Sequence, residues 1–122
     1  MLKVKIDADH ALVILEPDGA LTDNDFRLAA QLIDPVIEKN GSLKGLIIQT
    51  RSFPGWASFA ALVSHLRFVR EHHKSVKRIA FVTDSPVGSF AEAIGNHFVS
   101  AEIRHFAYDE FSHARNWVLY GE

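Results

Sequence analysis

A short apolar run followed by a helical stripe is the feature that most constrains the fold of this chain. Residues 45–50 read Gly-Leu-Ile-Ile-Gln-Thr, which is typical of a buried strand. Pro54 and Gly55 then interrupt the pattern, and apolar residues recur at helical spacing from Phe59 to Val69. In sheets of parallel strands, ligands bind where a strand of this kind leads into a helix.

The rest of the chain repeats this alternation. Strands are expected at 2–6, 11–15, 46–50, 78–83 and 101–106. Helices are expected at about 23–39, 59–69 and 87–98, and from Asp109 onward. The first two strands form a hairpin, and right-handed crossovers join the later ones. The fold class is therefore α/β, in the order β-β-α-β-α-β-α-β-α, with a mostly parallel five-stranded sheet and an antiparallel edge strand. Residues 1–122 make one domain.

The boundaries of the first helix are marked by specific residues. Thr22 and Asp25 resemble a capping box at its start, and Gly41 is typical of the position just beyond its end. Pro35 lies inside the apolar pattern and disfavours a helical conformation in the residue before it, which predicts a kink there.

Composition excludes several classes of protein. A chain that is 48% hydrophobic and 23% charged is an ordinary globular protein, and its net charge of -2 gives no overall attraction to nucleic acid. The absence of cysteine excludes thiolate catalysis and Cys-ligated metals. No signal-peptide pattern is visible, and no apolar run approaches the roughly 20 residues of a spanning helix, so a cytoplasmic location is expected.

Cations gather near the end of the second predicted helix, at Arg67, Arg70 and Lys74. They have two interpretations. They complement the negative end of the helix dipole, or they form a patch that contacts an acidic partner or the head groups of a membrane surface.

No catalytic or metal-binding set is visible. Ser52 and Ser85 are explained as cap or turn residues, and no Gly-x-Ser-x-Gly elbow occurs. His65 and His72 would lie about 10 Å apart along one helix, too far to share one ion. An enzymatic function would depend on His65 and His97 alone. We therefore expect a protein that is not an enzyme and that has no catalytic residues, no metal and no cofactor.

Aromatic residues gather where two predicted helices begin. Because the carboxyl ends of neighbouring parallel strands lie side by side, these helix starts should be neighbours. The candidate ligand-binding residues are Phe53, Trp56, Phe59 and Phe90. Core packing is the alternative for each of them, but an apolar groove here would accept a fatty acid or lipid. The candidate contacts for an anionic head group are Gly55, Gly88 and Ser89.

Several short stretches resemble the SpoIIAA-like proteins, which belong with the STAS domains of anti-sigma-factor antagonists and are related in fold to CRAL-TRIO lipid-binding domains. The stretches are Phe-Pro-Gly-Trp at 53–56, Arg-Ile-Ala-Phe-Val-Thr at 78–83, Arg-His-Phe at 104–106 and Ala-Arg-Asn-Trp at 114–117. The resemblance implies a compact α/β domain, commonly dimeric, that binds a ligand or partner around its second and third helices.

The chain departs from the antagonists at one motif. They carry a phosphorylatable serine in an Asp-Ser-Ser-Gly-like turn after the third strand, whereas residues 51–56 here read Arg-Ser-Phe-Pro-Gly-Trp. Two functions follow as expectations. The first is a non-catalytic binding domain for an apolar or amphipathic, lipid-like ligand, with peripheral membrane contact. The alternative is a regulatory protein-protein interaction module of the antagonist type without its phosphorylatable serine. In either case we expect a homodimer that does not bind nucleic acid.

Overall fold

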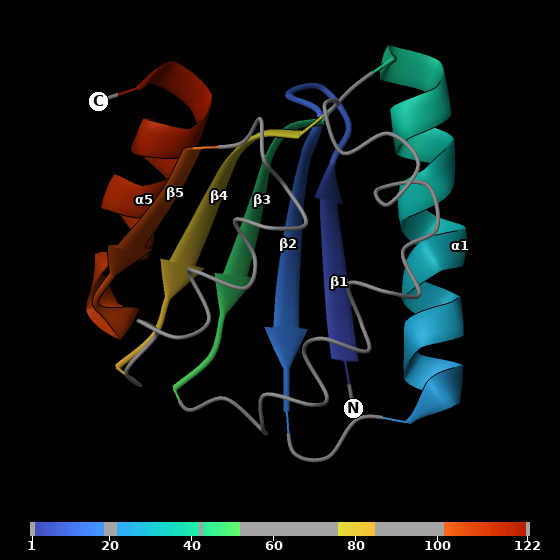
Figure 1. Ribbon diagram of the computed structural model, residues 1–122, viewed down its shortest axis with the longest axis horizontal. Coiled ribbons are helices and arrows are strands. Elements are labelled where there is room, and N and C mark those ends of the chain that lie inside the picture. Colours follow the sequence, from blue (N-terminus) through green and yellow to red (C-terminus); the bar gives the residue numbers. More distant parts are fainter. Residues whose placement is uncertain (1, 19–21, 42, 52–75, 85–101, 122) are drawn as a thin grey trace.

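The computed structural model describes residues 2–18, 22–41, 43–51, 76–84 and 102–121. Figure 1 shows a sheet with α-helices at both of its sides. The strands are β1 (Leu2–Asp7), β2 (Leu12–Pro17), β3 (Leu43–Gln49), β4 (Val76–Val82) and β5 (Glu102–Phe106). The helical elements are α1 (Asp23–Asn40), the short 3-10 helix η2 (Tyr108–Glu110) and α5 (Phe111–Tyr120).

The sheet has five strands in the order β1-β2-β3-β4-β5. β1 pairs antiparallel with β2, and the other neighbouring strands pair in parallel. The predicted α/β fold class and the antiparallel edge strand are therefore confirmed. β3 and β4 begin a few residues earlier than the apolar runs suggested, at Leu43 and Val76. The helices predicted at 59–69 and 87–98 lie outside the described residues.

The ends of α1 form as the sequence predicts. Asp25 N donates to Thr22 Oγ1 over 3.3 Å, and Thr22 N donates to Asp25 Oδ2 over 2.9 Å, which completes a capping box. At the other end Gly41 adopts a left-handed conformation with φ 75°, and its N–H donates to Ile37 O over 2.7 Å. Both ends thus satisfy backbone groups that a helix leaves unpaired.

α1 continues through Pro35 without a break. Proline has no N–H, so the carbonyl of Gln31 loses its intrahelical donor. Pro35 and Gln31 are both exposed, and water can take the place of that donor. The position on the outer side of the helix explains why the chain tolerates proline here. The kink expected at this point stays a prediction.

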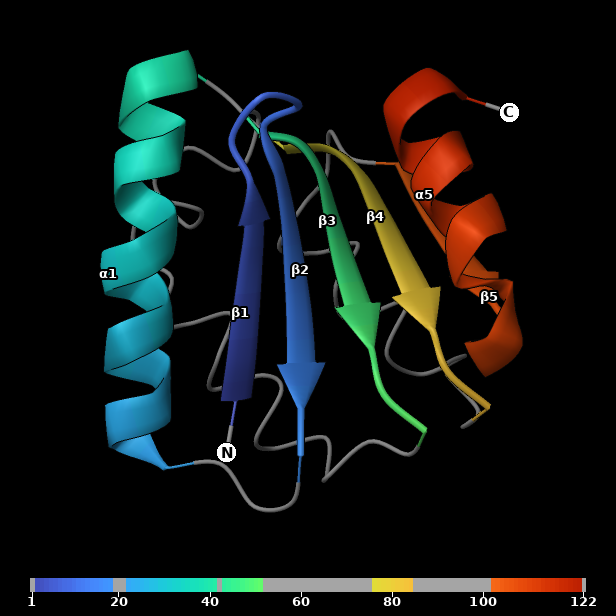
Figure 2. The ribbon, with the colours of Figure 1, turned by 180° about the vertical axis from the view of Figure 1, so that it is seen from behind.

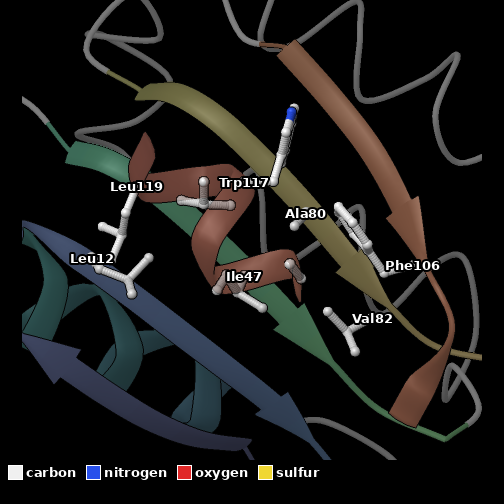
Figure 3. Close-up of a cluster of buried hydrophobic side chains, with 9 residues drawn as sticks. Leu12, Ile47, Ala80, Val82, Phe106, Trp117 and Leu119 are labelled. Atoms are coloured by element: carbon white, nitrogen blue, oxygen red, sulfur yellow. The ribbon is translucent and has the colours of Figure 1, made fainter. Parts of the chain in front are cut away.

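The central strands β2, β3 and β4 carry buried side chains on both faces of the sheet. Leu12, Ile47, Ala80 and Val82 point to one face and pack with Phe106 against α5, as Figure 3 shows. Since side chains alternate along a strand, the intervening residues point to the opposite face, where α1 lies. These equally buried residues are Val13, Leu15, Leu46, Ile48, Ile79 and Phe81. Continuous apolar strands such as β2 and β3 are expected of a sheet that is covered on both faces.

α5 packs closely against the centre of the sheet. Ala114, Trp117 and Val118 are buried and Phe111 is partly buried, as their helical spacing places them on one side of α5. A Cβ atom at Gly45 of β3 would collide with the Val118 side chain and lie 3.3 Å from the Arg78 carbonyl oxygen. Only glycine at this position allows α5 to approach the strand so closely.

Arg78 of β4 holds the end of α5. Its Nη1 atom donates to the carbonyl oxygens of Trp117 and Val118 over 3.3 and 3.4 Å, and its guanidinium lies 5.8 Å from the Trp117 ring. A cation at this position also complements the negative end of the helix dipole. Two of the stretches that carry the family resemblance, 78–83 and 114–117, therefore meet in a structural contact.

Replacing Gly45 with alanine should destabilise the fold by about 1–3 kcal/mol, the usual cost of overpacking a core. The same substitution should cost less in a Val118→Ala background, because the colliding side chain is then absent. Urea denaturation of the four proteins of this cycle measures both values. An equal cost in the two backgrounds would contradict the contact between α5 and β3.

The turn between β1 and β2 is tied to α5 by a charged cluster. Asp7 Oδ2 lies 2.9 Å from His10 Nδ1 and 2.8 Å from Arg115 Nη2. The hydrogen bond with His10 is the largest influence and lowers the pKa of the Asp7 carboxyl; desolvation raises that pKa, and the hydrogen bond from Arg115 lowers it further, so the net shift is downward. The cluster joins the edge hairpin to the last helix of the chain.

The Asp7 cluster should stabilise the fold only while its carboxylate is charged. Because the pKa is lowered in the folded state, the contribution is present above the unfolded pKa of about 3.9 and is lost as the pH falls through the lower folded pKa. Asp7→Asn should therefore reduce the free energy of unfolding at neutral pH and have little effect in strong acid. Denaturation at both pH values checks this, with Asp9→Asn in the same turn as the control. A loss that is equally large in strong acid would show that the charge is not responsible.

Candidate functional site

The described residues form a pocket of about 350 Å³ at the carboxyl ends of β2 and β3. This is the end of a parallel sheet at which ligands bind. Its described lining consists of Lys3, Glu16, Pro17, Asp18, Gln49, Thr50, Arg51 and Tyr108. Seven of these eight side chains are polar or charged, so the described part of the pocket is suited to a polar group.

The hairpin supplies one wall of the pocket. Lys3 pairs directly with Glu16 across β1 and β2, and the two side chains point to the face on which α5 lies. Lys5 Nζ of the edge strand β1 lies 3.1 Å from Glu16 Oε1 and fixes that carboxylate of β2. Of the described elements, α5 packs mainly on β3 and β4, and the side chains on this part of the hairpin are charged.

The opposite wall is built from Arg51 and Tyr108. The guanidinium of Arg51 lies 4.7 Å from the centre of the Tyr108 ring, a cation–π contact. Tyr108 N donates to Asp84 Oδ1 over 3.2 Å, and Thr83 Oγ1 donates to the Arg51 carbonyl oxygen over 3.3 Å. The chain that leaves β3, the chain that leaves β4 and the start of η2 are thereby held together.

Backbone hydrogen bonds continue the sheet to this edge. Thr50 N donates to Val82 O over 3.1 Å, and Thr83 N donates to Phe106 O over 3.0 Å. The His105 ring also contacts the Thr83 carbonyl oxygen, with Nε2 at 2.7 Å. The predicted proximity of the segments that leave β3 and β4 is confirmed for the residues described, Arg51, Thr83 and Asp84.

Charges of both signs face the pocket. Lys3 and Arg51 bring two positive charges, and Glu16 and Asp18 bring two negative ones. None of the eight described lining residues is histidine, serine or cysteine, the usual partners in nucleophilic catalysis. Among the described residues, no group of three or more His, Cys, Asp and Glu side chains is placed to hold a metal ion. The arrangement is suited to binding a polar group that carries both charges.

A second pocket of about 280 Å³ lies at the other end of the sheet. It is lined by Asp9, His10, Ala11, Asn40, Lys44 and Lys77. Asn40 is the last residue of α1, whose C-terminal carbonyl groups favour cations, and this explains the two lysines without a ligand.

The candidate residues predicted from the sequence all lie outside the described residues, in 52–75 and 85–101. They comprise the aromatic set, Phe53, Trp56, Phe59 and Phe90, with the head-group set, Gly55, Gly88 and Ser89, and the basic set, Arg67, Arg70 and Lys74. Their roles stay predictions. The described pocket lies at the same end of the sheet as the expected site and is lined by different residues.

Four lining residues are not predicted from the sequence: Lys3, Glu16, Arg51 and Tyr108. A lysine in an edge strand such as β1 is already explained as protection against pairing with another sheet, so Lys3 gives no signal of a pocket. Arg51 had a usable signal, because a charged residue directly after a buried strand lies at the carboxyl edge of the sheet. Tyr108 had none, because its place over Arg51 depends on how α5 packs.

Comparisons with known proteins agree on the fold. A family model described as SpoIIAA-like matches residues 12–119. A crystal structure of an uncharacterized protein of the DUF3478 family from Shewanella loihica PV-4, described as having a SpoIIAA-like fold, is similar with a TM-score of 0.62 and 17% sequence identity. The similarity covers 97% of this chain and 92% of that one, and at this identity it shows the fold alone. No curated protein matches the chain in sequence. The relation to CRAL-TRIO domains stays a prediction.

The contact between Arg51 and Tyr108 should be measurable as a coupling free energy. In a double-mutant cycle with Arg51→Gln and Tyr108→Leu we expect about 0.5–1 kcal/mol of coupling, the range of an exposed cation–π contact. The matched control pairs Arg51→Gln with Tyr120→Leu at the far end of α5, where the two effects should add. Additive effects in the Tyr108 cycle as well would show that the wall of the pocket is not held in this way.

Proposed function

The chain belongs to the SpoIIAA-like family, and from that premise we propose that it is a non-catalytic binding domain for a small amphipathic ligand. The observation that carries this proposal is the pocket at the carboxyl ends of β2 and β3, with Arg51 held over Tyr108 in its wall. Small-molecule sites are usually preformed and concave, and their fixed polar groups set the orientation of the ligand.

The charges in the pocket support a ligand whose polar end carries both signs. Arg51 and Lys3 would contact its anionic group, and Glu16 and Asp18 would contact its cationic group. A purely apolar ligand would exclude water from these charged side chains without replacing its hydrogen bonds, which is unfavourable. The polar wall therefore favours the amphipathic form of the sequence-based proposal over the apolar one.

The apolar part of the ligand is assigned to the residues that follow Arg51. Phe53 and Trp56 come two and five positions later in the chain, so an apolar tail beside them would continue from a head group at Arg51. Peripheral membrane contact through Arg67, Arg70 and Lys74 is a further part of the proposal. In the described ranges, no helix has the length and apolar character needed to cross a bilayer.

Calorimetric titration with three decyl amphiphiles tests the proposal below their micellar concentrations. We expect decylphosphocholine, which carries both charges, to bind more tightly than decanoate or decyltrimethylammonium. Arg51→Gln and Glu16→Gln should each weaken it about tenfold or more, because a hydrogen bond to a charged group contributes about 1.5–3 kcal/mol. Lys77→Gln at the opposite end of the sheet is the matched control and should leave the dissociation constant unchanged.

A zwitterionic amphiphile that fails to bind, or that binds all three variants like the wild type, would contradict this assignment. The second candidate function, a regulatory protein-protein interaction module, would then be favoured. Its support is the family match, since the antagonists of anti-sigma factors share this fold class. The cytoplasmic location stays a prediction under either function.

A further inference from the structure

Gln49 lines the pocket from the middle of the sheet. It is the last residue of β3, and Figure 2 shows this strand between the hairpin of β1 and β2 on one side and β4 on the other. Gln49 pairs with Val82, whose side chain points to the face on which α5 lies (Figure 3). Residues that pair across neighbouring strands point to the same face, so the Gln49 side chain lies on that face as well.

The Gln49 side chain ends a row of polar groups that crosses three strands. Lys3 pairs with Glu16 across β1 and β2. The parallel register of β2 and β3, continued by one residue, places Glu16 beside Gln49. The row thus runs from a cation through an anion to an uncharged amide, and its next member, Val82, belongs to the apolar core. Gln49 therefore lies at the boundary between the charged part of the pocket and the core.

The side-chain amide of Gln49 is half-buried and has no hydrogen-bond partner within the described ranges. The neighbouring carboxylate differs in this respect, because Glu16 Oε1 lies 3.1 Å from Lys5 Nζ. Polar groups that are shielded from water are normally hydrogen-bonded. An amide that lines a pocket without a partner from the described part of the chain is therefore a group that a ligand can satisfy.

The chemistry of the amide limits what it binds. It carries no charge to balance an ion, and it offers two N–H donors and a carbonyl acceptor. A hydroxyl group suits it, since a hydroxyl also donates and accepts. Gln49 lies beside Glu16 in the sheet and two residues before Arg51 in the chain. The hydroxyl must therefore be bonded close to the charged groups of the ligand.

We propose that Gln49 selects amphiphiles that carry a hydroxyl group next to the zwitterionic head group. The inference rests on the proposed function and narrows its ligand class to molecules with a hydroxylated link between head and tail, such as a glycerophospholipid with a single chain. A ligand that lacks the hydroxyl would leave the shielded amide unpaired, and its affinity falls for that reason. Gln49 thus determines specificity, whereas Arg51 and Glu16 contact the charges.

Calorimetric titration with a matched pair of ligands tests the inference. Both carry a phosphocholine head group and one decyl ether chain on a three-carbon link, and they differ only in a hydroxyl or a hydrogen on the middle carbon. The wild type should bind the hydroxyl-bearing ligand about three to ten times more tightly, the usual effect of one hydrogen bond between neutral groups.

Gln49→Met keeps a side chain of similar length but has no N–H donor and only a weak acceptor. This variant should bind the two ligands with dissociation constants that agree within about twofold. Gln31→Met is the matched control, because Gln31 is exposed on α1, and it should keep the full preference of the wild type.

The outcomes separate this inference from the proposed function. A preference that is present in the wild type and in Gln31→Met, and lost in Gln49→Met, supports it. Equal binding of both ligands by the wild type overturns the inference and leaves the proposed function standing, as does a preference that Gln49→Met retains. A wild type that binds neither ligand overturns both. Because the two ligands are also compared on the wild type, the inference can fail whatever the stability of the variant.

Discussion

The close approach of α5 to β3 at Gly45 is the contact on which the rest of the described structure depends. Without a side chain at residue 45, Val118 can lie directly over the strand, and Arg78 can reach the last carbonyl groups of the helix. The other end of α5 is then fixed as well, because the helix is rigid. That end begins beside η2, which carries Tyr108, so a packing contact in the core positions one wall of the pocket at the carboxyl edge.

The coverage of the sheet explains why the pocket is polar. α5 lies over β3 and β4, and the hairpin of β1 and β2 extends beyond it on the same face. Residues of the hairpin that α5 covers are apolar, as at Leu12, whereas those beyond it are charged, as at Lys3 and Glu16. The contact of Asp7 with Arg115 lies at the other end of the hairpin, beside Leu12, and ties that end to α5. Among the described elements, the pocket thus lies over the part of the hairpin that extends beyond α5.

Local sequence patterns were sufficient to predict the described helices and strands, but they were not sufficient to predict the contacts between them. The capping residues of α1, the continuous apolar run of β2 and the inward residues of α5 each follow from short-range rules, and the structure has them as expected. The meeting of Gly45 with Val118 joins segments far apart in the chain, and nothing in either segment specifies the other. The lining of the pocket could not be predicted for the same reason, because Lys3, Arg51 and Tyr108 come from three separate parts of the sequence. The aromatic groove was inferred from neighbouring helix starts, and its residues lie outside the described ranges.

The position of α5 at the end of the element order has a consequence for how the protein is made. A ribosome releases all five strands before it releases the helix that shields Ile47, Ala80 and Val82. During that interval the nascent chain exposes the apolar side chains that α5 later covers. Their native packing cannot form until the last turn of α5 has emerged. Chaperones that hold apolar surface would act on this chain late in its synthesis, and premature termination before Trp117 would leave a product prone to aggregation.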